Sequence, residues 1–503
     1  MPSLTRRPLL SVVRAASSLT QRGPRPRRSE ACGEAGRLRL IESDFISGTR
    51  TLLLPLPLPL LEEMLGMPGW WWSLLVDEFC GVRIKKLSVS LCLQTETFSA
   101  AIDAMWWDTS NVITNIPECL ALFFIIFWLG IRAVHLIAII YAKYRLHRRI
   151  ENCPEIPLPG ISILKPLTGC DPNLYSNLET FFVMNYPTYE LLFCIEDELD
   201  DAVAIVRQLI EKYKHVNAQL FIGGEQVGIN PKINNMQTGY SAAKYELIMI
   251  SDAGIRMKED TLRDMVYHLT EKTGIVHQMP FTCDREGFAA TYEKIFFGTV
   301  MARMYLVADL LRINCHTGMS TLMRKKLLDE VGGLRTFGVY LAEDFFIAKS
   351  ITDRNWRIRI SSQPALQNSG FCEVTAFQAR LARWIKLRLA MVPLTTVIEP
   401  LSECVLLGAA TSWATYYLLR WDPLVFFMGH LLMWFLWDFI LLSIIQHGTL
   451  PFSKFEFVLG WLFREFTGLP LFLHAVKDPQ IQWRSRSYRL RWGGVAEDFT
   501  KKV

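Results

Sequence analysis

Three aspartates follow, or lie in loops beyond, short apolar runs of the kind that form buried strands. They are Asp197, Asp252 and Asp344. Carboxylates placed in this way can hold a divalent cation against a diphosphate and remove a proton from an attacking hydroxyl. Each aspartate taken alone is also what a solvated loop would carry. The chemical interpretation therefore depends on the three occurring together.

An Arg-Leu-Ala-Arg-Trp motif follows the third aspartate and contributes Arg380, Arg383 and Trp384. Guanidinium groups bind phosphates through paired hydrogen bonds, and an indole ring offers a flat face to a sugar or an apolar acceptor. By itself, such a motif beside an apolar segment is more typical of a basic membrane anchor. Its position behind three acids favours a site for a nucleotide-linked sugar.

An α/β domain is the element that must position these side chains. Short apolar runs typical of buried parallel strands alternate with helical stretches such as 202–213 and 261–270. Because ligands bind beyond the carboxyl ends of such strands, the acids are expected to gather there. The predicted strands cover residues 160–164, 190–195, 220–222 and 246–250.

An apolar segment at 120–141 precedes this domain and is long enough to cross the roughly 30 Å hydrocarbon layer. Arg132 and His135 interrupt it, and Arg132 must reach the interface or find a partner. The basic residues that follow, from Lys143 to Arg149, place the next domain on the cytosolic side by the positive-inside rule.

Membrane character returns near the C-terminus, in segments 398–419, 424–445 and 455–475. The third contains Arg464 and Glu465 and is expected to be interfacial or re-entrant. The predicted organisation is a leader at 1–116, a transmembrane helix at 117–142, a cytosolic catalytic domain at 150–390, a membrane region at 391–476 and a cytosolic tail at 477–503.

Composition agrees with an integral membrane protein that has a sizeable soluble part. Of 503 residues, 50% are hydrophobic and 20% are charged, below the roughly 25% of soluble domains. A net charge of +5 without a long basic run argues against a nucleic-acid partner. The 11 cysteines are scattered without zinc-ligand spacing, and Cys315 is interpreted as a bystander rather than a nucleophile.

Further blocks occur in order between the acids, among them 163–167, 171–174, 228–235 and 342–346. On these blocks, the three aspartates and the Arg-x-x-Arg-Trp motif, the chain resembles the inverting glycosyltransferases of GT-A fold with the D, D, D, (Q/R)xxRW signature. Within that group it is most similar to the ceramide glucosyltransferases. The resemblance runs from about Cys119 to the C-terminus.

The resemblance implies a GT-A-type α/β domain that transfers glucose from UDP-glucose to the primary hydroxyl of ceramide with inversion. It implies a divalent cation, Mg²⁺ or Mn²⁺, contact with membrane lipids, and a Golgi membrane location with the catalytic domain facing the cytosol. Asp344 would be the catalytic base and Asp252 the metal ligand. The implied donor-binding residues are Asp197, Asp252, Lys232, Lys165, Arg380, Arg383 and Trp384.

Two departures and two alternatives stay open at this point. The second acidic motif reads Asp252-Ala253-Gly254 where many metal-dependent relatives have a second aspartate, and Met301 stands where vertebrate relatives have a histidine. The alternatives are another membrane lipid or polysaccharide glycosyltransferase, such as a dolichyl-phosphate sugar synthase or a β-glucan synthase, and a non-catalytic membrane scaffold that retains the fold. The oligomeric state is also open.

Overall fold

The computed structural model describes residues 116–148, 158–483 and 486–499, all within one compact unit that spans 105–503. The predicted leader, 1–116, lies outside the described residues apart from Ile116.

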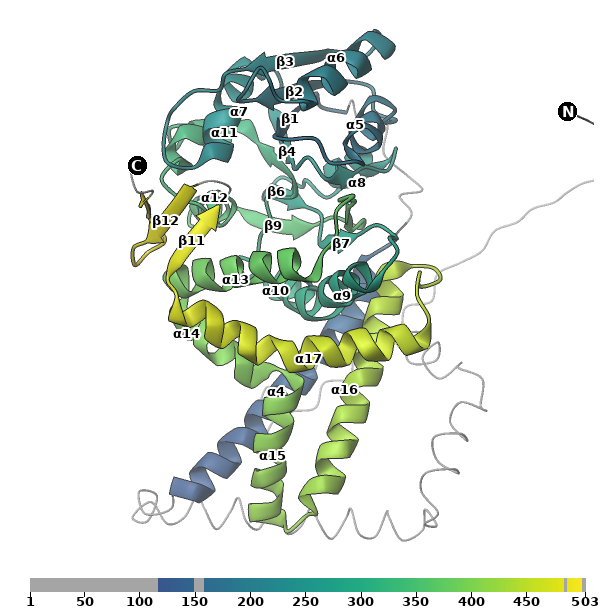
Figure 1. Cartoon of the computed structure of the whole chain (residues 1–503), viewed down its shortest axis with the longest axis vertical. Coiled ribbons are helices and arrows are strands. Elements are labelled where there is room, and N and C mark those ends of the chain that lie inside the picture. Colours follow the sequence, from purple (N-terminus) through teal and green to yellow (C-terminus); the bar gives the residue numbers. More distant parts are fainter. Residues whose placement is uncertain (1–115, 149–157, 484–485, 500–503) are drawn as a thin grey trace, which may run out of the picture. The chain divides into compact units, whose positions relative to one another are not determined.

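A seven-stranded sheet lies at the centre of the α/β part. Its strands are β1 Ile161–Leu167, β2 Tyr189–Ile195, β3 Ala218–Ile222, β4 Leu247–Ser251, β6 Thr273–His277, β8 Ser320–Arg324 and β9 Arg357–Ile360. They follow the order β3-β2-β1-β4-β8-β6-β9. Figure 1 shows β3, β2, β1 and β4 side by side in this sheet. The first four are parallel, β8 is antiparallel to both β4 and β6, and β9 is parallel to β6. The predicted mostly parallel sheet is confirmed.

Helices cover both faces of this sheet, which explains why β1, β2 and β4 are buried along almost their whole length rather than at alternate residues. Ile161 and Ile163 of β1 face one core, whereas Leu164 faces the other. The first core is covered by α5 Leu174–Phe182, α6 Ala202–Lys212 and α8 Thr261–Tyr267. The second is covered by α7 Pro231–Ala242, α11 Lys325–Asp329 and α12 Glu343–Thr352.

A third core joins the α/β part to the apolar helices. In it, Phe281, Tyr292 and Phe377 pack in one cluster with Trp434 and Trp461. The elements that contribute include β7 Pro280–Thr282, β10 Ala365–Gln367, α9 Phe288–Phe296, the π-helical turn η1 Phe297–Met301, α10 Ala302–Leu311 and α13 Val374–Met391. The strands β7 and β10 belong to a small sheet whose third strand is β5 Ile255–Arg256.

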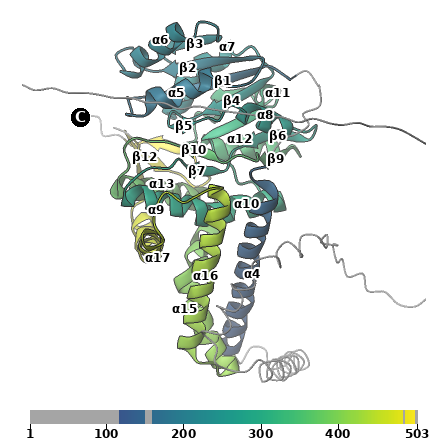
Figure 2. The ribbon, with the colours of Figure 1, turned by 90° about the vertical axis from the view of Figure 1, so that its right-hand side faces the viewer.

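Two helices in the described part of the chain are long and apolar enough to cross a membrane, α4 Ile116–Arg145 and α16 Pro423–Gln446. They lie beside α15 Cys404–Leu419 (Figure 2). Arg132, in the middle of α4, is buried with its guanidinium 4.2 Å from the ring centroid of Trp437. This cation–π contact is the kind of partner that an arginine in a span requires.

The segment expected as one span at 398–419 is divided in the structure. It consists of α14 Pro393–Ile398, the 3₁₀ turn η3 Glu399–Ser402 and α15, and the axis bends by 71° at the break. Pro400 has no N–H to continue a helix, and Glu403 adopts an extended backbone. The bent pair would be a third span if it crosses as one unit.

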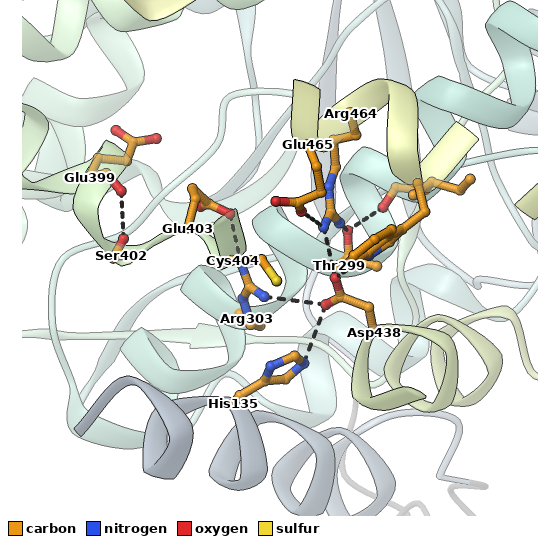
Figure 3. Close-up of polar contacts among 12 residues, drawn as sticks. His135, Thr299, Arg303, Glu399, Ser402, Glu403, Cys404, Asp438, Arg464 and Glu465 are labelled. Atoms are coloured by element: carbon orange, nitrogen blue, oxygen red, sulfur yellow. Dashed lines mark hydrogen bonds and ion pairs between the residues drawn. The ribbon is translucent and has the colours of Figure 1, made fainter. Parts of the chain in front are cut away.

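A buried group of polar side chains connects these helices, and we call it the Asp438 cluster. Asp438 of α16 accepts hydrogen bonds from Arg303 Nη1 at 3.2 Å and, on its other oxygen, from Arg464 Nη2 at 2.8 Å. The remaining members are His135, Thr299 and Trp461 (Figure 3). Because Asp438 is fully buried and contacted on both oxygens, the cluster fastens α4, α10, α16 and α17 Lys454–Lys477 to one another.

The last described residues, which were predicted only as a cytosolic tail, form a small sheet. β11 Gln480–Trp483, β12 Arg486–Leu490 and β13 Ala496–Asp498 make an antiparallel sheet. Its buried residues Ile481 and Tyr488 pack with Leu341 and Ala342, directly before α12. The sheet therefore supports the helix that carries Asp344.

Candidate functional site

The carboxyl ends of the parallel strands lie at one edge of the sheet, and two of the predicted acids are there. Asp252 follows β4 immediately, and its backbone N–H donates to Met319 O at 2.9 Å. Asp197 follows β2 and is exposed, and its Oδ1 accepts from the N–H of Leu199 at 2.9 Å. The sheet thus supplies the positions that the strand pattern predicted for these two residues.

Lys232, in the first turn of α7, connects residues from three separate elements. Its Nζ lies 2.9 Å from Asp252 Oδ1 and 3.1 Å from Glu343 Oε1. Asn230 caps α7 by accepting from the N–H of Lys232 at 2.8 Å, and its Nδ2 donates to Glu343 Oε2 at 2.9 Å. The residue that starts the helix therefore also orients the glutamate beside the lysine.

Asp344 lies next to this lysine in the first turn of α12. Its Oδ2 accepts from the N–H of Gly318 at 2.9 Å, and its Oδ1 accepts from the N–H of Phe345 at 2.8 Å. A Cβ added at Gly318 would lie 3.1 Å from Asp344 Cβ and 3.3 Å from Lys232 Nζ. Gly318 is therefore the point at which the lysine and the aspartate meet. We call Lys232, Asp252, Glu343 and Asp344 the Lys232 cluster.

In this cluster the single cation Lys232 lies close to three carboxylates, and this imbalance of charge affects the pKa values of Lys232, Glu343 and Asp344. Burial raises the pKa of both Asp344 and Glu343, while the charge of Lys232 acts in the opposite direction. Burial by itself lowers the pKa of Lys232, but the charges of Asp252, Glu343 and Asp344 outweigh it and hold that pKa above its ordinary value. Lys232 is thus a permanent cation, and Asp344 is a stronger base than an ordinary aspartate.

Lys165 lies on β1 behind the cluster and is completely buried. Its Nζ donates to the backbone oxygen of Asp252 at 2.7 Å and lies 3.9 Å from the centre of the Phe181 ring. Burial lowers the pKa of Lys165 to about 7, opposed by the charge of Asp252. Lys165 was predicted to contact the donor, and in the structure it contacts the turn that positions Asp252.

The Arg-x-x-Arg-Trp motif lies on α13 and faces in two directions. Arg380 Nη2 donates to Glu293 Oε1 at 2.7 Å, and its guanidinium lies 5.1 Å from the centre of the Trp384 ring. The guanidinium of Arg383 lies 5.6 Å from the centre of the Trp483 ring. Burial lowers the pKa of Arg383, while the charges of Glu343 and Asp252 act in the opposite direction.

The geometry therefore brings some predicted residues together and leaves others apart. Lys232, Asp252 and Asp344 form one cluster, with Lys165 behind it and Arg383 within electrostatic range. The contacts of Arg380 are instead to Glu293 and Gln367, and those of Asp197 are to its own loop.

Comparison with known proteins identifies the group to which this arrangement belongs. The profile of glycosyl transferase family 21 matches residues 130–496. The chain belongs to glycosyl transferase family 21. Ceramide glucosyltransferase 1 of Caenorhabditis elegans is 47% identical over 363 residues, which cover 72% of this chain and 78% of that protein. Ceramide glucosyltransferase 3 of the same organism is 43% identical, over 76% of this chain and 83% of that protein.

These matches confirm the resemblance to ceramide glucosyltransferases that the sequence motifs indicated. Among solved structures, the mannosyltransferase PcManGT from Pyrobaculum calidifontis, in complex with GDP-Man and Mn²⁺, aligns with a TM-score of 0.40 and 16% identity over 71% of this chain and 96% of that one. The TarS 1-349 structure from S. aureus aligns with a TM-score of 0.30 and 11% identity, over 68% of this chain and 97% of that one.

For a family 21 enzyme, the fit of a divalent cation can be judged from the donor atoms. Among the described residues there is no group of three or more His, Cys, Asp or Glu that could hold a metal ion by itself. The side chain of Asp252 is 41% exposed, so it can contribute one carboxylate. Mg²⁺ often keeps water and substrate phosphate oxygens as its other ligands, and the site fits a cation only in that form.

Three residues that contact the predicted site residues were not selected from the sequence. Glu343 precedes Asp344 and pairs with Lys232, Glu293 holds Arg380, and Trp483 covers Arg383. The adjacent Glu343-Asp344 pair at a helix start was a usable signal for the first. Glu293 and Trp483 had none, because each meets its arginine from a segment about a hundred residues away in the sequence.

Proposed function

We propose that this protein transfers glucose from UDP-glucose to the primary hydroxyl of ceramide, with inversion at the anomeric carbon. The observation that carries the proposal is the 47% identity to a ceramide glucosyltransferase across 78% of that relative. The Lys232 cluster supports it, because it combines a strengthened base with a permanent cation at the ligand edge of the sheet.

In the proposed reaction Asp344 acts as the general base. The ceramide oxygen attacks the anomeric carbon, its proton passes to a carboxylate oxygen of Asp344, and the bond from carbon to the UDP oxygen breaks as UDP leaves. No bond to the protein forms, so no nucleophilic side chain is required. The hydrogen bonds from Gly318 and Phe345 fix the carboxylate, and the raised pKa of Asp344 favours proton acceptance.

Positive charge near the leaving diphosphate comes from this chain's own residues. Lys232 is held at the cluster by two carboxylates, and Arg383 lies within electrostatic range of the same acids. Their charges offset the negative charge that grows on UDP as the sugar departs. A divalent cation, Mg²⁺ or Mn²⁺, would supply further charge when bound to Asp252, the diphosphate and water.

The other donor contacts remain part of the proposal. Asp197 would bind near the uridine, because it follows the strand next to β1 at the same edge of the sheet. Arg380 and Trp384 would shape the site through their stacked pair, and Lys165 would act by fixing the turn at Asp252.

The apolar helices explain how the protein could reach a lipid acceptor. Ceramide is too apolar to diffuse freely in water, so the reaction needs a site that the lipid enters from a bilayer. We propose a multi-pass Golgi membrane protein whose catalytic domain faces the cytosol. The support is the pair of apolar helices and the basic end of α4, at Lys143 and Arg145.

The test is product identification with purified protein in detergent micelles. UDP-glucose, UDP-galactose and UDP-N-acetylglucosamine are each supplied with short-chain ceramide and Mg²⁺ or Mn²⁺, and the lipid product is identified by mass spectrometry and NMR. We expect a single β-linked glucose on ceramide, formed only from UDP-glucose, and loss of activity on adding EDTA. A polymer, a glycosylated polyprenyl phosphate, or no transfer from any donor would overturn the proposal.

A further inference from the structure

A cavity of about 340 Å³ lies beside the α13 motif, between that helix and the membrane-side elements. Its walls come from α9, η1, α13, η3, α15 and α17, and they include Val300, Trp384 and Leu469. Leu469 is 36% exposed and Phe466, also in the wall, is 69% exposed, so the cavity reaches the outer surface at α17. Its volume is in the range of about 300–1,000 Å³ that small-molecule sites occupy.

Most of the lining is apolar, but one side carries charged groups that are already held in place. Arg388 Nη2 donates to Glu399 Oε1 at 2.8 Å, and Glu403 accepts from Arg303 at 3.3 Å. Arg464 and Glu465 pair on α17, next to the Asp438 cluster (Figure 3). The cavity thus joins an apolar wall to a fixed polar wall.

The carboxylates of that polar wall keep acceptor capacity beyond their ion pairs. Each of Glu399, Glu403 and Glu465 is paired with one arginine, and a carboxylate has about four lone-pair sites for hydrogen bonds. Pro470, inside α17, has no N–H, so the carbonyl of Phe466 cannot receive the usual helical bond and is a further acceptor. A wall whose arginines are already neutralised by carboxylates suits a neutral head group with O–H and N–H donors and offers no unpaired cation to a phosphate.

One wall residue connects the cavity to the segment that carries the base. Trp384 lines the cavity and packs in the same cluster as Leu341 and Ala342, which directly precede α12. Cys315 is close enough to both Arg388 and Asp344 for their charges to act on its thiol in opposite directions. Trp384 therefore contacts both the cavity and the segment that leads into the helix of Asp344.

We infer that this cavity binds the acceptor lipid, a neutral long-chain amide with free hydroxyls. Its hydroxyl and amide groups bind the carboxylates and the Phe466 carbonyl, its reacting hydroxyl points past Trp384 toward Asp344, and its chains leave between α17 and α15 into the bilayer. This inference rests on the proposed function and deepens it, because it assigns the acceptor site to residues outside the Lys232 cluster.

The experiment compares two leucines of the same helix. Leu469→Trp fills the cavity, whereas Leu459→Trp makes the same change at a residue that is 44% exposed and outside the cavity wall. For Leu469→Trp we expect the KM for long-chain ceramide to rise roughly tenfold, because the indole takes up volume that the lipid would fill and removes part of its apolar contact area. The KM for UDP-glucose should stay unchanged, and Leu459→Trp should behave like the wild type. An unchanged ceramide KM in Leu469→Trp would overturn the inference.

A second measurement on the wild-type protein covers the case in which Leu469→Trp does not fold. A ceramide with a diazirine in its acyl chain is irradiated with the protein, and the labelled peptides are identified. We expect label on α17 and η1 that unlabelled ceramide removes and phosphatidylserine does not. Label confined to other elements would overturn the inference. The proposed function fails separately, by absence of glucosylceramide from the wild-type enzyme, whatever the labelling pattern.

Discussion

Two ionic clusters in this molecule differ in how far their charges are satisfied. In the Asp438 cluster one fully buried carboxylate is contacted on both oxygens, by Arg303 and His135 on one and by Arg464 and Trp461 on the other. In the Lys232 cluster a single cation faces three carboxylates, and Asp252 is 41% exposed. A saturated cluster holds helices together, whereas an unsaturated, accessible one keeps carboxylate oxygens for a substrate and a proton.

Removing the central charge of the saturated cluster should have the largest effect on stability. In Asp438→Asn, Arg303 and Arg464 lose their common counter-charge inside the protein, so we expect destabilisation by about 3–5 kcal/mol. Thermal unfolding in detergent, followed by tryptophan fluorescence, measures it. Asp422→Asn is the matched control on the same helix, because Asp422 caps α16 and asparagine caps equally well. Equal melting temperatures for the two variants would contradict the role assigned to Asp438.

Removing the cation of the unsaturated cluster should change protonation rather than folding. Burial raises the pKa of Asp344, and the charge of Lys232 is the largest effect that lowers it. Lys232→Met therefore leaves only the hydrogen bonds from Gly318 and Phe345 to oppose burial. Because the base must be deprotonated, activity should be lost at a higher pH than in the wild type. We expect the acidic limb of the profile of kcat/KM against pH to move upward by about 1 unit or more.

The control for this shift is Lys244→Met, which removes an exposed lysine that is 3.7 Å from Glu190. Its acidic limb should coincide with that of the wild type. An acidic limb that stays in place in Lys232→Met would show that the titrating group is not next to Lys232.

The smallest effect is expected where the C-terminal sheet meets the site. Arg383→Lys keeps the charge but loses the flat guanidinium over Trp483, so we expect a decrease in kcat/KM equivalent to about 0.5–1 kcal/mol. Trp483→Phe completes a double-mutant cycle with it. If the two changes are fully additive, the contact does not support the site.

The sequence predicted the features of the site that depend on local patterns. Apolar runs gave β1, β2, β3 and β4 to within a few residues, and Asp252 follows β4 as expected. The 71° break at Glu403 was missed, because apolarity extends across it and only Pro400 marks it. The pairing of Arg380 with Glu293 was also missed, since both residue types are compatible with a solvated surface until the fold buries them.

The C-terminal sheet was the largest omission. Its strands are short, and β11 and β12 each bury only one residue, Ile481 and Tyr488, which is too few to give a clear alternating pattern. They become buried only because Leu341 and Ala342 lie opposite. Such a pairing depends on residues about 140 positions apart, which no local pattern records.

We propose that the Lys232 cluster is catalytic and the Asp438 cluster is structural. The most direct test of this difference is single-turnover glucosyl transfer by Asp344→Asn. Asparagine can still accept a backbone hydrogen bond at this position, so the variant should fold and bind UDP-glucose with wild-type affinity. We expect transfer to slow by about 10²–10⁴-fold, the usual contribution of a general base. Asp353→Asn, at the exposed end of the same helix, should transfer at the wild-type rate. Near-normal transfer by Asp344→Asn would contradict the assignment of the base.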